Sequence, residues 1–486
     1  MPGTPRKPAR RRNAQTASRG PTLSWPGRSW IPGGVAERAA PEATVDERVG
    51  DGAHRIVHAD VLDLAGHLRA LGLAGSVDLV YVDPPYASQA DYVLEARLDG
   101  RADGRVRRAL AYEDTWSERE GGGAAYLEML APRLEALASL LSERGTLWVH
   151  LDWRASYLVR VVLDEIMGRD AFLNEIVWRR APNLGRQAAS SQFGRTLDTI
   201  VVYGRPGAKL TPPLRLEPIE PSAIRRDDEG RPFTSAPRGD YTDQSIAKLD
   251  KEGRVHRTAS GKVYIKYFLV PDATGRLCRE RRVDTLWTDV APLRHAAASE
   301  RTGFPTQKPR ALLERIIACA TSPGALVVDG FAGSGTTGEA AHALGRRAIL
   351  GDRAAPAVAL CRARLLRAGA GLVVERVGRE APRGAPARAA AAPVEGGREV
   401  VLHAPKEPLA WAVGREVGGV LETAFHAERG VGKSPAKVAT TCTLPGEGPL
   451  VARVWGDDGA VSDVRLGGSA REARRSQLAL PLGASR

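Results

Sequence analysis

Cysteine is scarce in this chain, and long apolar runs are absent. Four of the 486 residues are cysteines, which is too few for a disulfide framework, and their spacing is too wide for a zinc knuckle. No apolar run reaches the roughly 18 residues that a membrane-spanning helix needs. We therefore expect no membrane span, no metal site, and four ordinary buried thiols: Cys278, Cys319, Cys361 and Cys442.

Acidic residues are missing from the N-terminus. Residues 1–22 contain six basic residues and no acid, and they lack the apolar core of a signal peptide. We expect a disordered basic tail and a cytoplasmic protein. The 43% apolar content is enough for a sizeable core, and the net charge of +13 favours a polyanionic partner.

The most informative stretch follows the apolar run 77–82. It reads Asp83-Pro84-Pro85-Tyr86, and because two prolines cannot continue a strand, it displays a carboxylate, a proline carbonyl and an aromatic face at a predicted strand end. These groups suit a flat ring that carries an amino group, since the oxygens accept hydrogen bonds from the amine while the aromatic side chain stacks on the ring. A turn with only a structural role is the alternative.

A second signal is a glycine-rich turn between the predicted strand 325–329 and a predicted helix. Gly333 and Gly335 would let the backbone approach a ligand closely. A further short strand ends in Asp352, 19 residues after Gly333, which is the distance at which a Rossmann-like unit places a carboxylate on ribose hydroxyls. A phosphate-binding loop is excluded because Thr336 stands where that loop needs lysine. A glycine-rich turn that binds no ligand is the remaining alternative.

Together these motifs resemble those of the DNA amino-methyltransferases, in the permuted subgroup whose catalytic motif precedes the cofactor motif. The resemblance extends to Thr306-Gln307-Lys308-Pro309 and to the segments 145–152 and 172–178, and it covers roughly residues 23–370. One departure is Gly330, which stands where the family usually has a proline. This change loosens the turn without removing a ligand group.

The resemblance implies a Rossmann-like, doubly wound α/β sheet with an inserted target-recognition region and a C-terminal appendage. The implied cofactor is S-adenosyl-L-methionine, the implied substrate is double-stranded DNA, and the implied reaction is methylation of the N6 amine of adenine after base flipping. The implied catalytic residues are Asp83, Pro84, Pro85 and Tyr86. The implied cofactor-binding residues are Asp60, Thr306, Lys308, Asp329, Phe331, Gly333, Gly335, Thr336, Thr337 and Asp352.

The cysteines also bear on the reaction. A thiolate that attacks carbon 5 of cytosine usually neighbours a proline, and none of the four cysteines does. Methylation of an amine needs no covalent intermediate, so amine methylation is favoured. N4 methylation of cytosine stays open, because an aspartate at position 83 favours adenine only statistically: the family's cytosine enzymes more often have serine there. A catalytically inactive DNA-binding protein and an RNA methyltransferase are less favoured alternatives.

The two motifs are predicted to meet in one pocket although about 250 residues separate them. Ligands of an open doubly wound sheet bind beyond the carboxyl ends of its strands, where the winding direction reverses. If residues 325–329 and 77–83 are the first strands of the two halves, both loops open at that point. The predicted strand 54–60 brings Asp60 to the same edge.

A restriction-system partner and a homodimer are left open, and action on DNA would place the protein at the nucleoid. A long mobile loop is expected over 88–123, and a surface stripe of Arg362, Arg364 and Arg367 on a helix over 355–367.

Composition divides the chain into six parts. The parts are the tail 1–22, the catalytic half 23–204, the basic target-recognition insert 205–300, the cofactor half 301–371, an alanine- and proline-rich linker 372–397, and a small mixed appendage 398–486.

Overall fold

The computed structural model describes most of the chain between Thr22 and Gly467, and the predicted basic tail lies outside the described residues apart from Thr22. The chain divides into two compact units, Met1–Leu210 with Trp287–Arg486, and Thr211–Leu286. The described residues are 22–35, 41–86, 91–97, 106–112, 114, 116, 122–183, 191–258, 260–380, 383–384, 386–405, 408–429 and 438–467.

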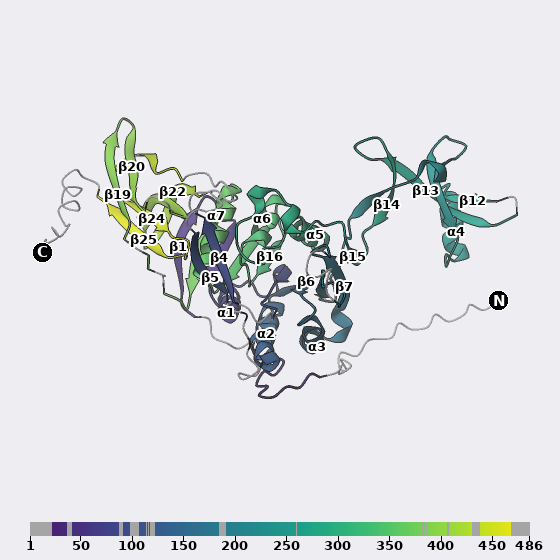
Figure 1. The fold of residues 1–486 in the computed structure, drawn as a ribbon, viewed down its shortest axis with the longest axis horizontal. Helices are drawn as coiled ribbons and strands as arrows, with labels where there is room; N and C mark the ends of the chain where they lie inside the picture. Colours follow the sequence, from purple (N-terminus) through teal and green to yellow (C-terminus); the bar gives the residue numbers. More distant parts are fainter. Residues whose placement is uncertain are drawn as a thin grey trace, which may run out of the picture. The chain divides into compact units, whose positions relative to one another are not determined.

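Six parallel strands form the centre of the larger unit (Figure 1). Most of their residues are buried, as expected for strands that are covered on both faces. Beyond β6 the sheet continues through the antiparallel strands β8 (Leu197–Gly204) and β7 (Phe172–Arg179) to the short β15 (Leu286–Trp287). The central order is β6 (Leu141–Leu151), β3 (Val77–Val82), β16 (Leu326–Asp329), β17 (Arg347–Asp352), β2 (His54–His58) and β18 (Leu372–Val377).

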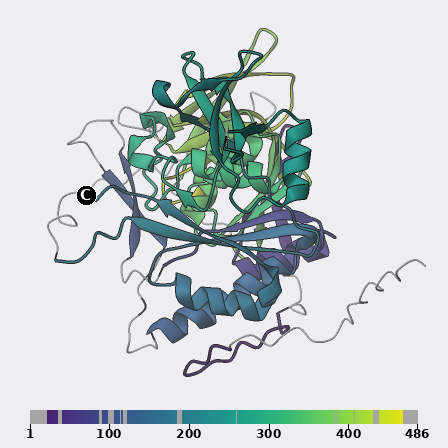
Figure 2. The same ribbon diagram turned by 90° about the vertical axis from the view of Figure 1, so that its right-hand side faces the viewer.

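Helices cover both faces of this sheet (Figure 2). On one face α2 (Gly122–Ala138) packs between α1 (Val61–Ala70) and α3 (Ser156–Met167). On the other face α6 (Thr336–Ala343) packs between α5 (Arg310–Ala320) and α7 (Ala355–Arg367). The predicted doubly wound α/β architecture is therefore confirmed. No helix within the described residues is long and apolar enough to cross a membrane.

The reversal of winding lies between β3 and β16, which are parallel neighbours. Asp329 at the end of β16 is in register with Tyr81 near the end of β3. From this point the chain proceeds outward through β6 on one side and through β17 on the other. The prediction that both motifs open at one edge of the sheet is confirmed, because the last residues of the two strands are adjacent.

The predicted surface stripe on α7 is wrong for two of its three arginines, and only Arg367 is exposed. Arg362 and Arg364 are buried, with 1% and 4% of their surface exposed. Arg362 makes a bidentate ion pair with Glu47 of β1 (Ala43–Val49), with N–O distances of 2.6 and 2.8 Å. Its guanidinium also lies 3.2 Å from Glu428 and 3.7 Å from the centroid of the Trp455 ring. Carboxylates supplied by distant strands let this helix face be buried.

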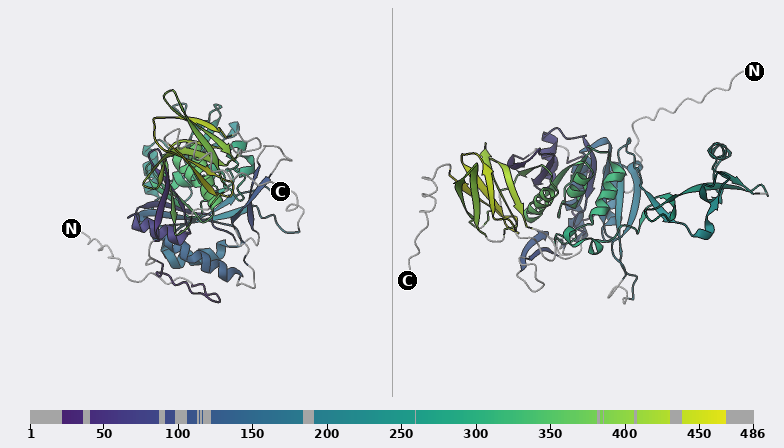
Figure 3. Two further views of the ribbon diagram at one scale, coloured as in Figure 1. Left: turned by 90° about the vertical axis from the view of Figure 1, so that its left-hand side faces the viewer. Right: turned by 90° about the horizontal axis from the view of Figure 1, so that it is seen from above.

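The C-terminal strands extend the central sheet (Figure 3). Strand β1 pairs antiparallel with β18 and parallel with β22 (Val420–Glu428). Antiparallel pairing then adds β21 (Ala410–Val417), β24 (Leu450–Trp455) and β25 (Val461–Leu466). The expected appendage is thus part of the same sheet, joined to it through β1.

A second sheet packs on this extension through its own apolar core, which includes Trp411 and Val400. It has three strands: β19 (Arg388–Val394), β20 (Gly397–Ala404) and β23 (Thr441–Pro445). Two expectations are corrected. The residues described between 398 and 467 form strands and turns without a helix, and the predicted linker contains β18 and β19. The consecutive alanines of this predicted linker lie in β19 and pair with residues of β20, which composition alone does not reveal.

The predicted mobile loop over 88–123 is also corrected. Its described residues include an antiparallel pair of strands, β4 (Tyr92–Arg97) and β5 (Val106–Tyr112), and its last residues begin α2. Short 3₁₀ helices in the larger unit are Arg169–Ala171, Leu293–His295 and Ala298–Glu300.

The smaller unit, Thr211–Leu286, lies inside the segment predicted as the insert. Its strands follow the order β10-β11-β13-β14-β9, and β12 pairs with β13. The bounds are β9 (Leu214–Pro218), the 3₁₀ helix Pro221–Ala223, β10 (Arg225–Arg226), β11 (Pro232–Pro237), α4 (Asp243–Lys251), β12 (Val255–Arg257), β13 (Val263–Pro271) and β14 (Leu277–Arg282).

Candidate active site

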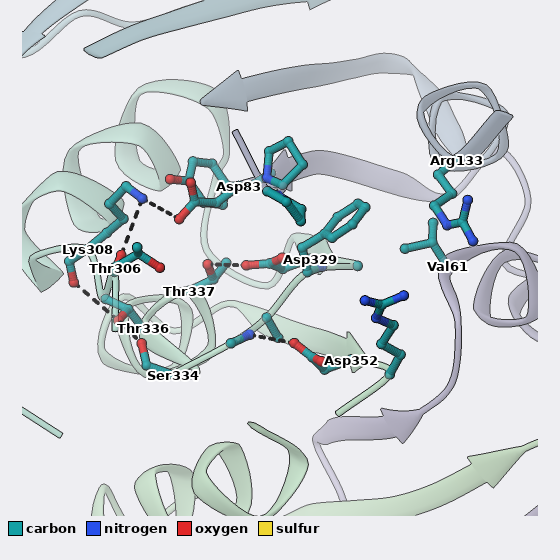
Figure 4. Close-up of a pocket in the computed structure, with 18 of the residues that line it drawn as sticks. Val61, Asp83, Arg133, Thr306, Lys308, Asp329, Ser334, Thr336, Thr337 and Asp352 are labelled. Carbon is teal, nitrogen blue, oxygen red and sulfur yellow. Dashed lines mark hydrogen bonds and ion pairs between the residues drawn. The ribbon is translucent and has the colours of Figure 1, made fainter. Parts of the chain in front are cut away.

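Four aspartates lie at the carboxyl ends of neighbouring parallel strands and line one pocket. Figure 4 shows three of them: Asp83, Asp329 and Asp352. Asp83 follows β3, Asp329 ends β16, Asp352 ends β17, and Asp60 follows β2. Parallel strands bring their carboxyl ends to the same edge of the sheet, so residues far apart in sequence converge here.

Thirteen of the fourteen residues predicted for the site line this pocket. Gly335 does not line it: it begins α6 with φ of 76°, and a Cβ atom there would lie 3.0 Å from Cys361. Its glycine is needed for the turn and for the close approach of α7. The lining residues are Asp60, Asp83, Pro84, Pro85, Tyr86, Thr306, Lys308, Asp329, Phe331, Gly333, Thr336, Thr337 and Asp352.

Asp83 is held from two sides. The Lys308 ammonium lies 2.5 Å from its Oδ2 atom, and the Tyr86 hydroxyl donates to its Oδ1 atom. Lys308 also donates to the Thr306 carbonyl at 3.3 Å, and its Nζ atom lies 5.2 Å from the centroid of the Tyr86 ring. Burial, followed by the Asp83 charge, raises the pKa of Tyr86 well above its ordinary value. The Tyr86 hydroxyl therefore stays protonated and remains a donor.

The backbone of the proline turn is also fixed. Tyr126 of α2 donates its hydroxyl to the Pro85 carbonyl at 2.9 Å. The Tyr86 amide donates to Asp114 Oδ2 at 3.2 Å. These bonds hold the turn at the pocket wall, to which Pro84, Pro85 and Tyr86 all contribute.

Behind Tyr86 lies a buried polar chain that sequence reasoning missed. The His150 ring stacks on the Tyr86 ring at 6.2 Å between centroids. One His150 nitrogen pairs with the Tyr81 hydroxyl at 2.9 Å and the other with Asp198 at 3.1 Å, and Arg180 lies 2.8 Å from Asp198. His150 lies in the segment 145–152 that carries the family resemblance, but only the pairing of β6 with β8 brings Asp198 to it.

The glycine-rich turn is shaped by two of the aspartates. Asp329 accepts from the Thr337 hydroxyl at 2.6 Å and from the Phe331 amide at 3.0 Å. Burial nevertheless dominates and raises the pKa of Asp329 to about 7. Asp352 accepts from the Gly333 amide at 2.9 Å, and burial raises its pKa as well. Both carboxyl groups therefore lie in a poorly hydrated part of the pocket.

Asp60 has partners that the sequence did not predict. It caps α1 through the Leu62 amide at 3.0 Å, and Arg133 of α2 lies 2.7 Å from its Oδ2 atom. Burial acts to raise the pKa of Asp60, but the hydrogen bond and the charge of Arg133 outweigh it and lower the pKa. Arg133 also lines the pocket. None of the sequence motifs includes Arg133, which lies on α2.

Thr306 and Thr336 occupy supporting positions at the pocket wall. Thr336 donates to the Lys308 carbonyl at 3.2 Å and accepts from Arg364 at 2.9 Å. Thr306 has φ of 60°, and among the described residues other than glycine it alone has a positive φ. A β-branched residue rarely adopts this conformation, so the segment that presents Lys308 holds local strain.

We expect the change Thr306→Gly to increase the free energy of unfolding by about 0.5–1 kcal/mol. Glycine adopts positive φ without steric cost, so the change should remove about 1–2 kcal/mol of steric strain from the folded state. This gain exceeds the free-energy cost of the greater conformational entropy that glycine gives the unfolded chain. Urea denaturation would measure the change. Thr306→Ala keeps a Cβ atom and serves as the control, and a Thr306→Gly variant less stable than the parent would show that the conformation is not strained.

Within the described part of the chain, no group of three or more His, Cys, Asp or Glu side chains could hold a metal ion. All four cysteines are buried and free, as predicted. For Cys361, which touches the glycine turn, burial raises the pKa of the thiol well above its ordinary value.

Comparison with known proteins adds family evidence to this geometry. The N6/N4 family model described as DNA methylase matches residues 77–360. The Type II methyltransferase M.EcaI of Enterobacter cloacae is 26% identical over 298 residues, covering 56% of this chain and 60% of that protein. The Type III restriction-modification enzyme StyLTI Mod subunit of Salmonella typhimurium is 26% identical over 326 residues, covering 59% of this chain and 49% of that protein. The chain thus spans about half to three fifths of these relatives.

Among solved structures, the PvuII DNA methyltransferase (cytosine-N4-specific) matches with 16% identity and a TM-score of 0.37 over 66% of this chain and 90% of that chain. The M1.HpyAVI–SAM complex matches with 17% identity and a TM-score of 0.36 over 64% of this chain and 98% of that chain. The family model, by contrast, matches more than half of the sequence. The chain belongs to the N6/N4 DNA methylase family.

Proposed function

We propose that this protein transfers a methyl group from S-adenosyl-L-methionine to an exocyclic amine of a DNA base, with N6 of adenine as the favoured target. The observation that carries the proposal is the meeting of Asp83-Pro84-Pro85-Tyr86 and the glycine-rich turn in one pocket, at the point where the sheet reverses its winding. Asp83 at the first motif position supports adenine over cytosine, as the family resemblance implies.

The residues of the glycine-rich turn fit the cofactor. Gly333 lines the pocket with φ of 49°, and a Cβ atom there would lie 3.1 Å from the Phe304 ring, so a side chain at this position would be strained and would crowd the pocket wall. Asp329 is buried and Asp352 is partly buried, and within the described residues neither carboxyl group forms an ion pair. Both suit a ligand that brings a positive charge and hydroxyl groups. When bound, the cofactor supplies a methyl group activated by a positively charged sulfur.

The other side of the pocket would hold the target amine. The Asp83 carboxylate and the Pro84 carbonyl would accept its two N–H groups and orient the nitrogen lone pair toward the methyl group. Each carboxylate oxygen can accept two hydrogen bonds, so Asp83 can receive the amine while Lys308 and Tyr86 remain bonded to it. The Lys308 ammonium, 2.5 Å from Asp83, would hold this carboxylate in place. The Tyr86 ring would stack on the extruded base.

Cofactor affinity should depend on pH through Asp329. Because the pKa of Asp329 is raised to about 7, its negative charge is present above that pH and is lost as the pH falls through it. A cationic ligand should therefore bind more weakly at about pH 6 than at about pH 8, by up to about tenfold. Titration calorimetry would measure this. Asp329→Asn should remove most of the dependence, and a parent affinity that does not change with pH would contradict the assignment.

Plasmid DNA produced together with the protein and digested to nucleosides would test the function. Mass spectrometry should detect N6-methyladenine above the level of a matched plasmid produced with Asp83→Ala. Detection of N4-methylcytosine instead would identify cytosine as the target base. Methylated RNA together with unmodified DNA would identify RNA as the substrate. Unmodified DNA and RNA would leave the inactive DNA-binding alternative.

The partners and the remaining domain roles are part of the same proposal. We propose that Thr211–Leu286, within the predicted insert 205–300, contacts the recognition sequence, supported by exposed basic residues such as Arg225 and Arg226. A restriction partner stays a prediction, prompted by the relative that is by name a Mod subunit of a restriction-modification enzyme. A homodimer and the permuted subgroup also stay predictions.

A further inference from the structure

Exposed aromatic side chains gather at one edge of the central sheet. Four exposed aromatic residues occur in the part of the chain that the structure describes, and three of them are Trp153, Tyr157 and Phe193, with 46%, 65% and 100% of their surface exposed. Leu197 is exposed nearby at the start of β8. Apolar side chains this exposed and this close together mark an interaction surface.

Arginines stack on this group. The Arg195 guanidinium lies 3.9 Å from the centroid of the Trp153 ring, and the Arg154 guanidinium lies 5.1 Å from it. The two acids of these segments are buried and paired, Asp152 with Arg154 and Asp198 with Arg180. The exposed Arg195 therefore leaves these segments with a net positive charge toward solvent. We call Trp153, Arg154, Tyr157, Phe193, Arg195 and Leu197 the Trp153 surface.

The sheet register places the Trp153 surface at the same edge as the pocket. Val82 of β3 is in register with Val149 of β6, so Asp83 and Trp153 both lie just beyond the carboxyl ends of neighbouring parallel strands. Leu151 is in register with Thr199 of β8, which brings residues 193–197 to that edge.

A chain of contacts joins the Trp153 surface to the pocket. The Arg180 amide donates to the Thr196 carbonyl at 3.0 Å, and the Arg180 side chain pairs with Asp198, which holds His150 under the Tyr86 ring. The start of β8, which follows Phe193 and Arg195, is therefore linked through these contacts to the ring that would receive the base.

We propose that the Trp153 surface contacts double-stranded DNA beside the target base and that the Phe193 ring fills the space which the extruded base leaves in the stack. This inference rests on the proposed function. Arginines suit phosphates, and an exposed aromatic ring compensates for stacking lost when a base leaves the helix. Contact between the Trp153 surfaces of two copies of this chain would bring two positively charged faces together, and their repulsion disfavours self-association through this surface.

Two measurements test the Trp153 surface. The first is binding of a fluorescein-labelled duplex of mixed sequence, which needs no turnover, and the second is methylation of unmodified plasmid with tritiated S-adenosyl-L-methionine. Phe193→Ala should lower kcat/KM for plasmid about tenfold, whereas Phe193→Trp, which keeps a ring, should stay within about threefold of the parent. Trp153→Ala combined with Arg195→Ala should weaken duplex binding about tenfold.

Val417→Ala removes another exposed apolar side chain, on β21, and is the matched control. Unchanged kcat/KM for Phe193→Ala, or an equal loss for Val417→Ala, would overturn the proposal. If the parent sediments as a dimer and the Trp153→Ala, Arg195→Ala variant as a monomer with unchanged affinity for duplex, the surface would be assigned to contact with a second copy. If the parent binds duplex through this surface but methylates no DNA, the proposed function fails and the surface assignment stands.

Discussion

The change Asp83→Ala is expected to lower kcat for DNA methylation by about 10²–10³-fold and to leave the affinity for S-adenosyl-L-methionine within about threefold of the parent. Its carboxylate contacts Tyr86 and Lys308, where we propose that the target amine binds, whereas Gly333 and Asp352 belong to the proposed cofactor side. Loss of one preorganised group that stabilises charge at a reacting centre typically costs this much. Single-turnover methylation and titration calorimetry would separate the two effects.

Two further variants make this test specific. Asp78→Ala removes a carboxylate from the other end of β3, where it accepts from the Leu326 amide at 2.9 Å, and most activity should remain. Asp83→Asn keeps the shape and one acceptor but loses the charge that pairs with Lys308, so intermediate activity is expected. Retention of a tenth or more of the parent rate in Asp83→Ala would refute the role of Asp83.

The change Glu47→Ala is expected to lower the free energy of unfolding by about 3–5 kcal/mol. Glu47 is fully buried, receives the two bonds from Arg362, and also accepts from the Thr423 hydroxyl at 2.6 Å. Its removal would leave the buried Arg362 guanidinium with only Glu428 as a charged partner. An incompletely paired buried charge is costly because water cannot solvate it. Urea denaturation with intrinsic tryptophan fluorescence would measure the loss.

Neighbouring residues provide the control. Glu422, on β22, lies 3.9 Å from Arg48, and both side chains are about half exposed, so Glu422→Ala should cost less than about 1 kcal/mol. The double change Glu47→Leu with Arg362→Met removes both charges and should recover much of the lost stability. If Glu47→Ala were no more destabilising than Glu422→Ala, this ion pair would not fasten the C-terminal strands to α7.

The same ion pair has a consequence for the domain organisation. Arg362 of α7, Glu47 of β1 and Glu428 of β22 join the cofactor half of the sheet to strands that composition assigned to an appendage. A truncation before β21 would expose these charged groups together with the apolar faces of β1 and α7. The C-terminal strands are therefore structural parts of the larger unit.

Local chemistry was enough to predict the core of the site. Two prolines must end a strand, glycines are needed where the backbone turns with positive φ, and a carboxylate 19 residues after Gly333 follows the next strand. If the two motif strands are the first strands of the two halves of a doubly wound sheet, both motifs are predicted to open at the switch point. These properties depend on neighbouring residues in the chain, and the structure places thirteen of the fourteen predicted residues in one pocket.

Only the tertiary structure decided which distant groups satisfy one another. The pairing of Lys308 with Asp83, of Arg133 with Asp60 and of His150 with Asp198 depends on strand register and helix packing. Arg362 shows the physical reason most clearly: an arginine on a helix is predicted to lie in water, because burial of its charge is unfavourable by itself. The carboxylates that reverse this preference come from strands more than 60 and 300 residues away, and no local pattern encodes that meeting.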